Sequence, residues 1–144
     1  MTQKQQSKKS KTDRLFILCD GDSIYGVSIY LFIGTYAKYS KYIQKEYNIA
    51  PEDQKFFGAS FQTIYHESGK MECGIIWMPL FKQSFSNWMT LSHECLHAAM
   101  KILEKCSVKI SFSNHESLAY LQEHLLSTAW NKLTENKRNN RNTK

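Results

Sequence analysis

The first half of the chain alternates short apolar runs with polar turns, the pattern typical of β-strands. Each run has six or seven residues and is rich in β-branched or aromatic side chains. Gly34 closes the second run and Pro79 follows the last one. The polar segment HESGKM separates the last two runs, so it predicts a hairpin turn with Gly69 near its tip. The four predicted strands are residues 14–19, 28–33, 59–65 and 72–78.

Three other segments repeat their apolar positions every three or four residues and therefore predict helices. The first, residues 35–47, lies between the two pairs of strands and has Thr35 as its candidate N-cap. Two longer segments, from 85 or 88 to 106 and from 114 to 133, follow the last strand. The order β–β–α–β–β–α–α predicts an α+β domain, with a small mixed or antiparallel sheet packed against its helices.

Charge separates the two ends of the chain from its body. The net charge is +6, yet residues 1–14 and residues 131–144 each carry five basic residues and one acidic residue, or +4 apiece. The remaining body is therefore at −2. We predict one domain over residues 14–134, between disordered basic tails at 1–13 and 135–144. The tails suit nucleic acid or an acidic partner, but no aromatic residue is interleaved with their charges, which favours solubilising ends.

Composition also sets expectations about the compartment. No apolar run is long enough to span a bilayer, so no membrane partner is expected. The first residues are polar and basic and lack the apolar core of a secretory signal, which favours a cytoplasmic protein. The four cysteines form no C-x-x-C pair and predict reduced thiols rather than a disulfide framework; they are Cys19, Cys73, Cys95 and Cys106.

The chemistry is concentrated in the motif His-Glu-x-x-His, at His93, Glu94 and His97. Histidines four residues apart lie on one face of a helix, where two imidazoles can share one Zn²⁺. Glu94 is rotated by about 100° from His93, so it can act as a general base on a water without being a metal ligand. The apolar residues around the motif predict a largely buried helix. Buried histidines need partners, and a metal would satisfy both; the alternative is two partly buried polar residues.

A catalytic zinc site needs a third protein ligand and one open position. Glu116 lies 19 residues after His97, near the start of the next helix, and a returning helix would bring it alongside the pair. An alternative role is structural, because Ser113-x-x-Glu116 also matches a capping box. Rival third ligands are His115, Glu104, Glu123 and His124.

HECLH, followed after nineteen residues by the Glu of NHESLAYL, resembles the gluzincin branch of the zincin metallopeptidases. The layout also resembles small zincin-like proteins encoded by tailed phages, for which host cytoplasm or the virion would be the location. The resemblance implies that the strand at 72–78 is an edge strand that aligns an extended peptide substrate. It further implies zinc ligation by His93, His97 and Glu116, a general base at Glu94, and an oxyanion-stabilising residue among Tyr120, His124 and His66.

Two functions are consistent with these features. The first is a zinc-dependent hydrolase, most simply a small metallopeptidase that acts on a peptide or protein substrate. The second is a non-catalytic protein in which Zn²⁺ stabilises a structural or interaction domain. Nucleic-acid binding through the basic tails is a third, less favoured reading, because the body of the chain is not basic.

Overall fold

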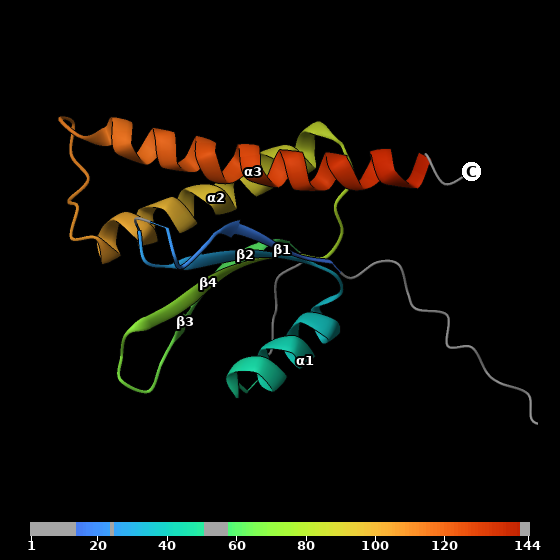
Figure 1. The fold of residues 1–144 in the computed structure, drawn as a ribbon, viewed down its shortest axis with the longest axis horizontal. Helices are drawn as coiled ribbons and strands as arrows, with labels where there is room; N and C mark the ends of the chain where they lie inside the picture. Colours follow the sequence, from blue (N-terminus) through green and yellow to red (C-terminus); the bar gives the residue numbers. More distant parts are fainter. Residues whose placement is uncertain (1–13, 24, 51–57, 142–144) are drawn as a thin grey trace, which may run out of the picture.

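A computed structural model describes residues 14–23, 25–50 and 58–141, with side chains up to residue 135. Within these ranges the chain forms three helices and a four-stranded mixed sheet, which confirms the predicted α+β class. The sheet lies between α1 on one side and the pair α2 and α3 on the other (Figure 1). The elements are β1 (Arg14–Cys19), β2 (Ser28–Ile33), α1 (Tyr36–Tyr47), β3 (Ser60–Tyr65), β4 (Met71–Met78), α2 (Phe85–Lys105) and α3 (His115–Arg141).

The strand order is β1-β2-β4-β3, so the hairpin does not add to the sheet in sequence order. β2 pairs with β1 in an antiparallel and with β4 in a parallel arrangement, while β3 and β4 are antiparallel. The predicted edge strand at 72–78 is therefore wrong: β4 is interior, and β3 forms that edge of the sheet. The reason is tertiary, because the connection through α1 lets the second strand of the hairpin, rather than the first, pair with β2.

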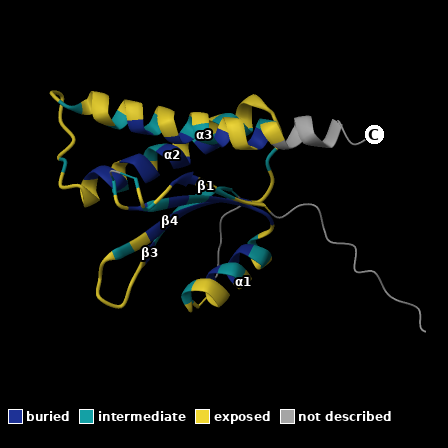
Figure 2. Cartoon of the chain, viewed as in Figure 1, coloured by how far each residue is buried: buried dark blue, intermediate teal, exposed yellow. Residues whose placement is uncertain are grey.

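The larger core lies between the sheet and the two long helices. α2 packs against β3 and β4, and α3 packs against α2 and β1. Figure 2 shows that the faces of α2 and α3 turned toward the sheet are buried while their outer faces are exposed. The apolar stripe of α3 enters this core through Leu121, Leu125, Ala129 and Leu133.

A second core fills the space between the sheet and α1, and it is largely aromatic. Tyr39 stacks on Trp77 with a centroid separation of 5.9 Å. The polar tips of both rings are satisfied: the Tyr39 hydroxyl donates to Gln62 Oε1 at 2.7 Å, and Trp77 Nε1 donates to the Gly34 carbonyl at 2.9 Å. Burial of the Tyr39 phenol raises its pKa above the usual range, so it stays a neutral donor.

The helix ends agree with the predicted boundaries except at the C-terminus. Thr35 occupies the N-cap of α1, although its side chain makes no capping bond. Before α2, Ser84 Oγ accepts a bond from the Asn87 N–H at 3.3 Å. α3 continues past Leu133 to Arg141, since neither Gly nor Pro interrupts this stretch. Part of the predicted C-terminal tail is thus helical, and residues 1–13 and 142–144 lie outside the described residues.

Two further sequence expectations can be compared with the fold. All four cysteines are free thiols, as predicted, and only Cys106 is exposed. Among the helices that the structure describes, none has both the length and the apolar character needed to cross a membrane.

Leu125→Ala is expected to lower the free energy of unfolding by roughly 2–5 kcal/mol. Leu125 is fully buried between α3, α2 and the sheet, so its loss leaves a cavity that the rigid neighbours fill only in part. Chemical denaturation followed by circular dichroism measures the change. Tyr120→Ala on the exposed face of the same helix is the control, with an expected change of about 0.5 kcal/mol or less. Equal effects of the two substitutions would contradict the packing of α3.

Candidate metal centre

His93 and His97 meet on the surface of α2, where the helical spacing stacks them one turn apart. Their Nε2 atoms share a hydrogen bond of 3.0 Å, and the two rings are nearly perpendicular with centroids 4.7 Å apart. Two Zn–N bonds of standard length at a tetrahedral angle place their nitrogens about 3.3 Å apart. The two imidazoles therefore need to open by only a few tenths of an ångström to share one ion.

The two histidines are more exposed than the sequence analysis predicts. Both histidines are exposed, whereas Glu94 between them is only 7 % exposed. α2 is buried on one face only, and both imidazoles lie outside that face. The argument that buried histidines would require a partner is therefore wrong, and the case for a metal depends on the convergence of the two Nε2 atoms.

Cys95 lies on the core side of α2 and is fully buried. Burial raises the pKa of its thiol to about 12, so the thiol is protonated near neutral pH when no metal is bound. Cys95 therefore faces away from the exposed histidines, as its position two residues from each of them requires in a helix.

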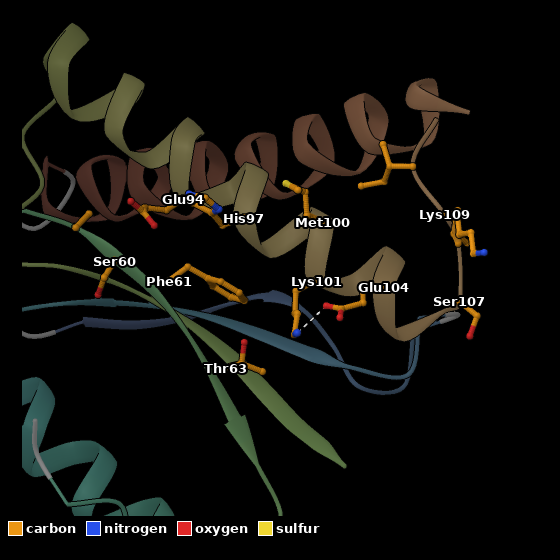
Figure 3. A pocket seen from close by; sticks show the side chains of 13 residues that line it. Ser60, Phe61, Thr63, Glu94, His97, Met100, Lys101, Glu104, Ser107 and Lys109 are labelled. Atoms are coloured by element: carbon orange, nitrogen blue, oxygen red, sulfur yellow. Dashed lines mark hydrogen bonds and ion pairs between the residues drawn. The ribbon is translucent and has the colours of Figure 1, made fainter. Parts of the chain in front are cut away.

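Glu94 and His97 line one pocket of about 940 Å³ between α2 and β3. Figure 3 shows both side chains near the start of β3, with Ser60 and Phe61 below them. In the part of the chain that the structure describes, no hydrogen bond or ion pair holds the Glu94 carboxylate. A buried carboxylate that faces a pocket without a fixed partner is suited to exchange a proton with a bound molecule.

The other end of the same pocket is lined by Lys101 and Glu104 of α2. Lys101 Nζ bonds Glu104 Oε2 at 2.6 Å and lies 5.9 Å from the centroid of the Tyr65 ring. The hydrogen bond to Glu104 is the main cause that raises the pKa of Lys101. Glu104, one of the rival third ligands, would have to give up this ion pair to bind a metal beside His97.

Glu116 lies in the exposed first turn of α3, which returns alongside α2 (Figure 1). Gln122 Nε2 donates to the Ser92 carbonyl at 3.0 Å, which fixes the level at which the two helices meet. Glu116 lies six residues before Gln122, which is about 9 Å along the axis of α3 and about 120° around it. Among the described residues, no group of three His, Cys, Asp or Glu side chains is assembled. Glu116 as the third ligand stays a prediction.

The capping box considered as an alternative role for Glu116 does not match the observed start of α3. α3 begins at His115, so Asn114 occupies the cap position, and its carbonyl accepts the Ser117 N–H at 3.1 Å. A box built on Ser113 would need a helix that begins one residue earlier. Glu116 in the first turn still interacts favourably with the helix dipole.

The remaining candidates lie apart from the pocket of Glu94 and His97. Tyr120 and His124 line a separate pocket of about 530 Å³ with Tyr25 and Leu103. His66 belongs to the β3–β4 turn, where its Nδ1 accepts the Ser68 N–H at 3.2 Å. The two other rivals are also on the surface of α3: Glu123 is exposed, and His115 bonds the Phe112 carbonyl at 2.7 Å through its Nδ1.

Sequence reasoning missed the residues that β3 contributes to the pocket. Ser60, Phe61 and Thr63 of β3, with Ala59 immediately before the strand, line the pocket opposite α2. Phe61 lies across Gly74 of β4, where an added Cβ would come within 2.6 Å of the ring. A glycine within a strand can indicate that another group approaches the backbone closely. Gly74 was therefore the sequence signal from which the position of Phe61 could have been predicted.

Comparison of the chain with protein families, curated proteins and solved structures finds no match. The resemblance to the zincins is therefore carried by the HECLH motif and its surroundings alone.

Proposed function

We propose that this protein is a zinc-dependent hydrolase, most simply a small metallopeptidase. The observation that carries the proposal is the convergence of the His93 and His97 Nε2 atoms beside the pocket that holds Glu94. Two nitrogen ligands and an adjacent buried carboxylate are the parts that metal-assisted hydrolysis requires. The proposed substrate is a peptide or protein.

The donor set fits zinc. Neutral imidazole nitrogens are common zinc ligands, and the 3.0 Å separation of the two Nε2 atoms is close to what one tetrahedral ion needs. Glu116 is the proposed third ligand. A bound Zn²⁺ would act as a Lewis acid that polarises the scissile carbonyl and makes an attacking water more acidic.

Glu94 has the proton-transfer role in this proposal. Its carboxylate accepts a proton from the attacking water as the water oxygen bonds to the carbonyl carbon. It then delivers that proton to the amide nitrogen as the C–N bond breaks, so the products are a carboxylic acid and an amine. Among the described residues the carboxylate is held by no other side chain, which leaves it available for both steps.

The edge strand β3 suits an extended substrate. One side of β3 pairs with β4, and its other side borders the pocket. An extended peptide can add to such an edge through main-chain hydrogen bonds, which would place its backbone beside Glu94 and His97.

The alternative of a purely structural zinc site is less consistent with the geometry. Structural zinc sites close their coordination with four protein ligands. The described residues bring two ligand side chains together, and both are exposed. The buried Glu94 carboxylate beside the histidine pair favours chemistry over a stabilising role, because a structural ion needs no general base.

Zinc removal and return test the proposal. We expect about one zinc per chain by elemental mass spectrometry, and cleavage of at least one component of a random peptide mixture. A chelator should abolish the cleavage, and added Zn²⁺ should restore it, because the metal activates the water. A protein that binds no zinc, even after zinc is added, would overturn the proposal. Zinc binding without any peptide cleavage would support the non-catalytic alternative instead.

A further inference from the structure

An exposed apolar surface lies at the end of the molecule where α2 begins. Phe85 is 83 % exposed, and Leu80, Met89 and Trp130 are about half exposed. Phe85 and Met89 lie one turn apart on α2. A row of ring contacts lies at the same end of the helix: Phe81 lies 4.7 Å from Trp88, and Trp88 lies 4.5 Å from Trp130, between ring centroids. We call these six residues the apolar end patch. None of them lines the pocket of Glu94 and His97.

The patch has a distinct charge environment. Residues 80–92 contain no Asp or Glu and include Lys82, which is exposed. The first turn of α2 likewise carries no acidic residue. Any partner of this surface therefore meets apolar and cationic groups, while the body of the chain as a whole is slightly acidic.

The part of α3 that follows Trp130 is also rich in basic residues. Its backbone is helical to Arg141, about 16 Å further along the axis. This part of α3 contains Lys137, Arg138 and Arg141. The sequence of this stretch thus adds three basic residues against one acidic residue, Glu135.

We propose that the apolar end patch and the basic end of α3 dock onto the surface of an anionic lipid membrane. Exposed Trp, Phe, Leu and Met side chains beside a cluster of basic residues are the combination that inserts shallowly into a headgroup layer and attracts acidic lipids. The expectation of no membrane partner rested on the missing spanning segment, and a surface contact needs none.

Charge complementarity favours an anionic membrane over two other partners that could cover the patch, a second copy of the chain and a nucleic acid. A second copy on the same patch would bring two basic helix ends together, and their repulsion would oppose the contact. A nucleic acid would supply phosphates and stacking for Trp130, but no apolar environment for Leu80 and Met89. An anionic bilayer supplies both negative charge and an apolar layer.

Vesicle co-sedimentation of the full chain tests the proposal. We expect binding to phosphatidylcholine vesicles that contain about 30 % phosphatidylserine, weaker binding to phosphatidylcholine alone, and release as salt rises well above the physiological range. The double variant Phe85→Ser/Met89→Ser should bind roughly tenfold more weakly or worse, because it removes two inserted apolar side chains. Lys137→Glu/Arg141→Glu should lower binding by at least about tenfold.

Phe112→Ser is the matched control, since Phe112 is 99 % exposed in the α2–α3 connection and lies outside the patch. It should bind vesicles like the wild type. Equal loss in Phe112→Ser and in Phe85→Ser/Met89→Ser would overturn the assignment of the surface. Absence of binding to anionic vesicles would overturn the proposal: affinity for a single-stranded oligonucleotide would then indicate nucleic acid, and a dimer lost in Phe85→Ser/Met89→Ser would indicate a second copy.

Discussion

Glu94→Gln is expected to retain zinc and to lose peptide cleavage by roughly 10²–10⁴-fold. The amide has nearly the same size and shape as the carboxylate, so His93 and His97 keep their positions. It cannot accept a proton from water, however, and the attack on the carbonyl then lacks its base. Elemental mass spectrometry of the variant, together with initial rates on a cleaved peptide, separates the metal from the chemistry.

The matched control is Glu67→Gln, which makes the same chemical change in the exposed β3–β4 turn, outside the pocket. It should retain both zinc and activity. Undiminished cleavage by Glu94→Gln would exclude Glu94 as the base. Loss of zinc from Glu94→Gln would instead indicate that Glu94 is a zinc ligand. The role of general base would then have to be assigned to another residue.

His97→Ala is expected to reduce the zinc content from about one ion per chain to a small fraction, and to abolish cleavage with it. Removing one of three ligands leaves too few donors to hold the ion. The fold should survive, because the His97 side chain is exposed, and surface substitutions usually change stability by about 0.5 kcal/mol or less. Zinc titration monitored by elemental mass spectrometry, with circular dichroism in parallel, measures both effects.

His66→Ala provides the control, since it removes an exposed histidine that lies in the β3–β4 turn. Its zinc content should equal that of the wild type. Glu116→Ala, measured in the same series, tests the third ligand: weakened zinc binding would support Glu116, and wild-type binding would transfer the role to a rival such as Glu104. Full zinc occupancy in His97→Ala would contradict the whole centre.

The metal-centre proposal and the membrane proposal can be tested independently, because the pocket and the apolar end patch lie on different parts of α2. The pocket lies along the C-terminal half of α2, from Glu94 and His97 to Glu104, and the patch gathers around its first turns. Substitutions at Phe85 and Met89 change exposed side chains away from the pocket. Failure of vesicle binding would therefore leave the metal-centre proposal standing, and the reverse also holds.

The sequence by itself determined the elements, because their signals are local. Alternation and β-branched residues fixed β1 and β2 at their observed bounds, and β3 and β4 to within one residue. The spacing of His93 and His97 determined that their rings would meet, since four residues make about one helical turn. The repeat of apolar positions every three or four residues in α3 likewise places Leu121 and Leu125 on one helix face, and that face is the buried one.

Only the tertiary structure decided which surfaces those elements present. Strand order depends on pairing between residues distant in the chain, so the interior position of β4 and the edge position of β3 had no local signal. The exposure of His93 and His97 and the burial of Glu94 depend on which face of α2 meets the sheet, which periodicity does not fix for a helix apolar over most of its circumference. The position of Glu116 relative to the histidines depends on how α3 is rotated against α2, and that rotation is set by side-chain packing across the helix interface rather than by spacing along the chain.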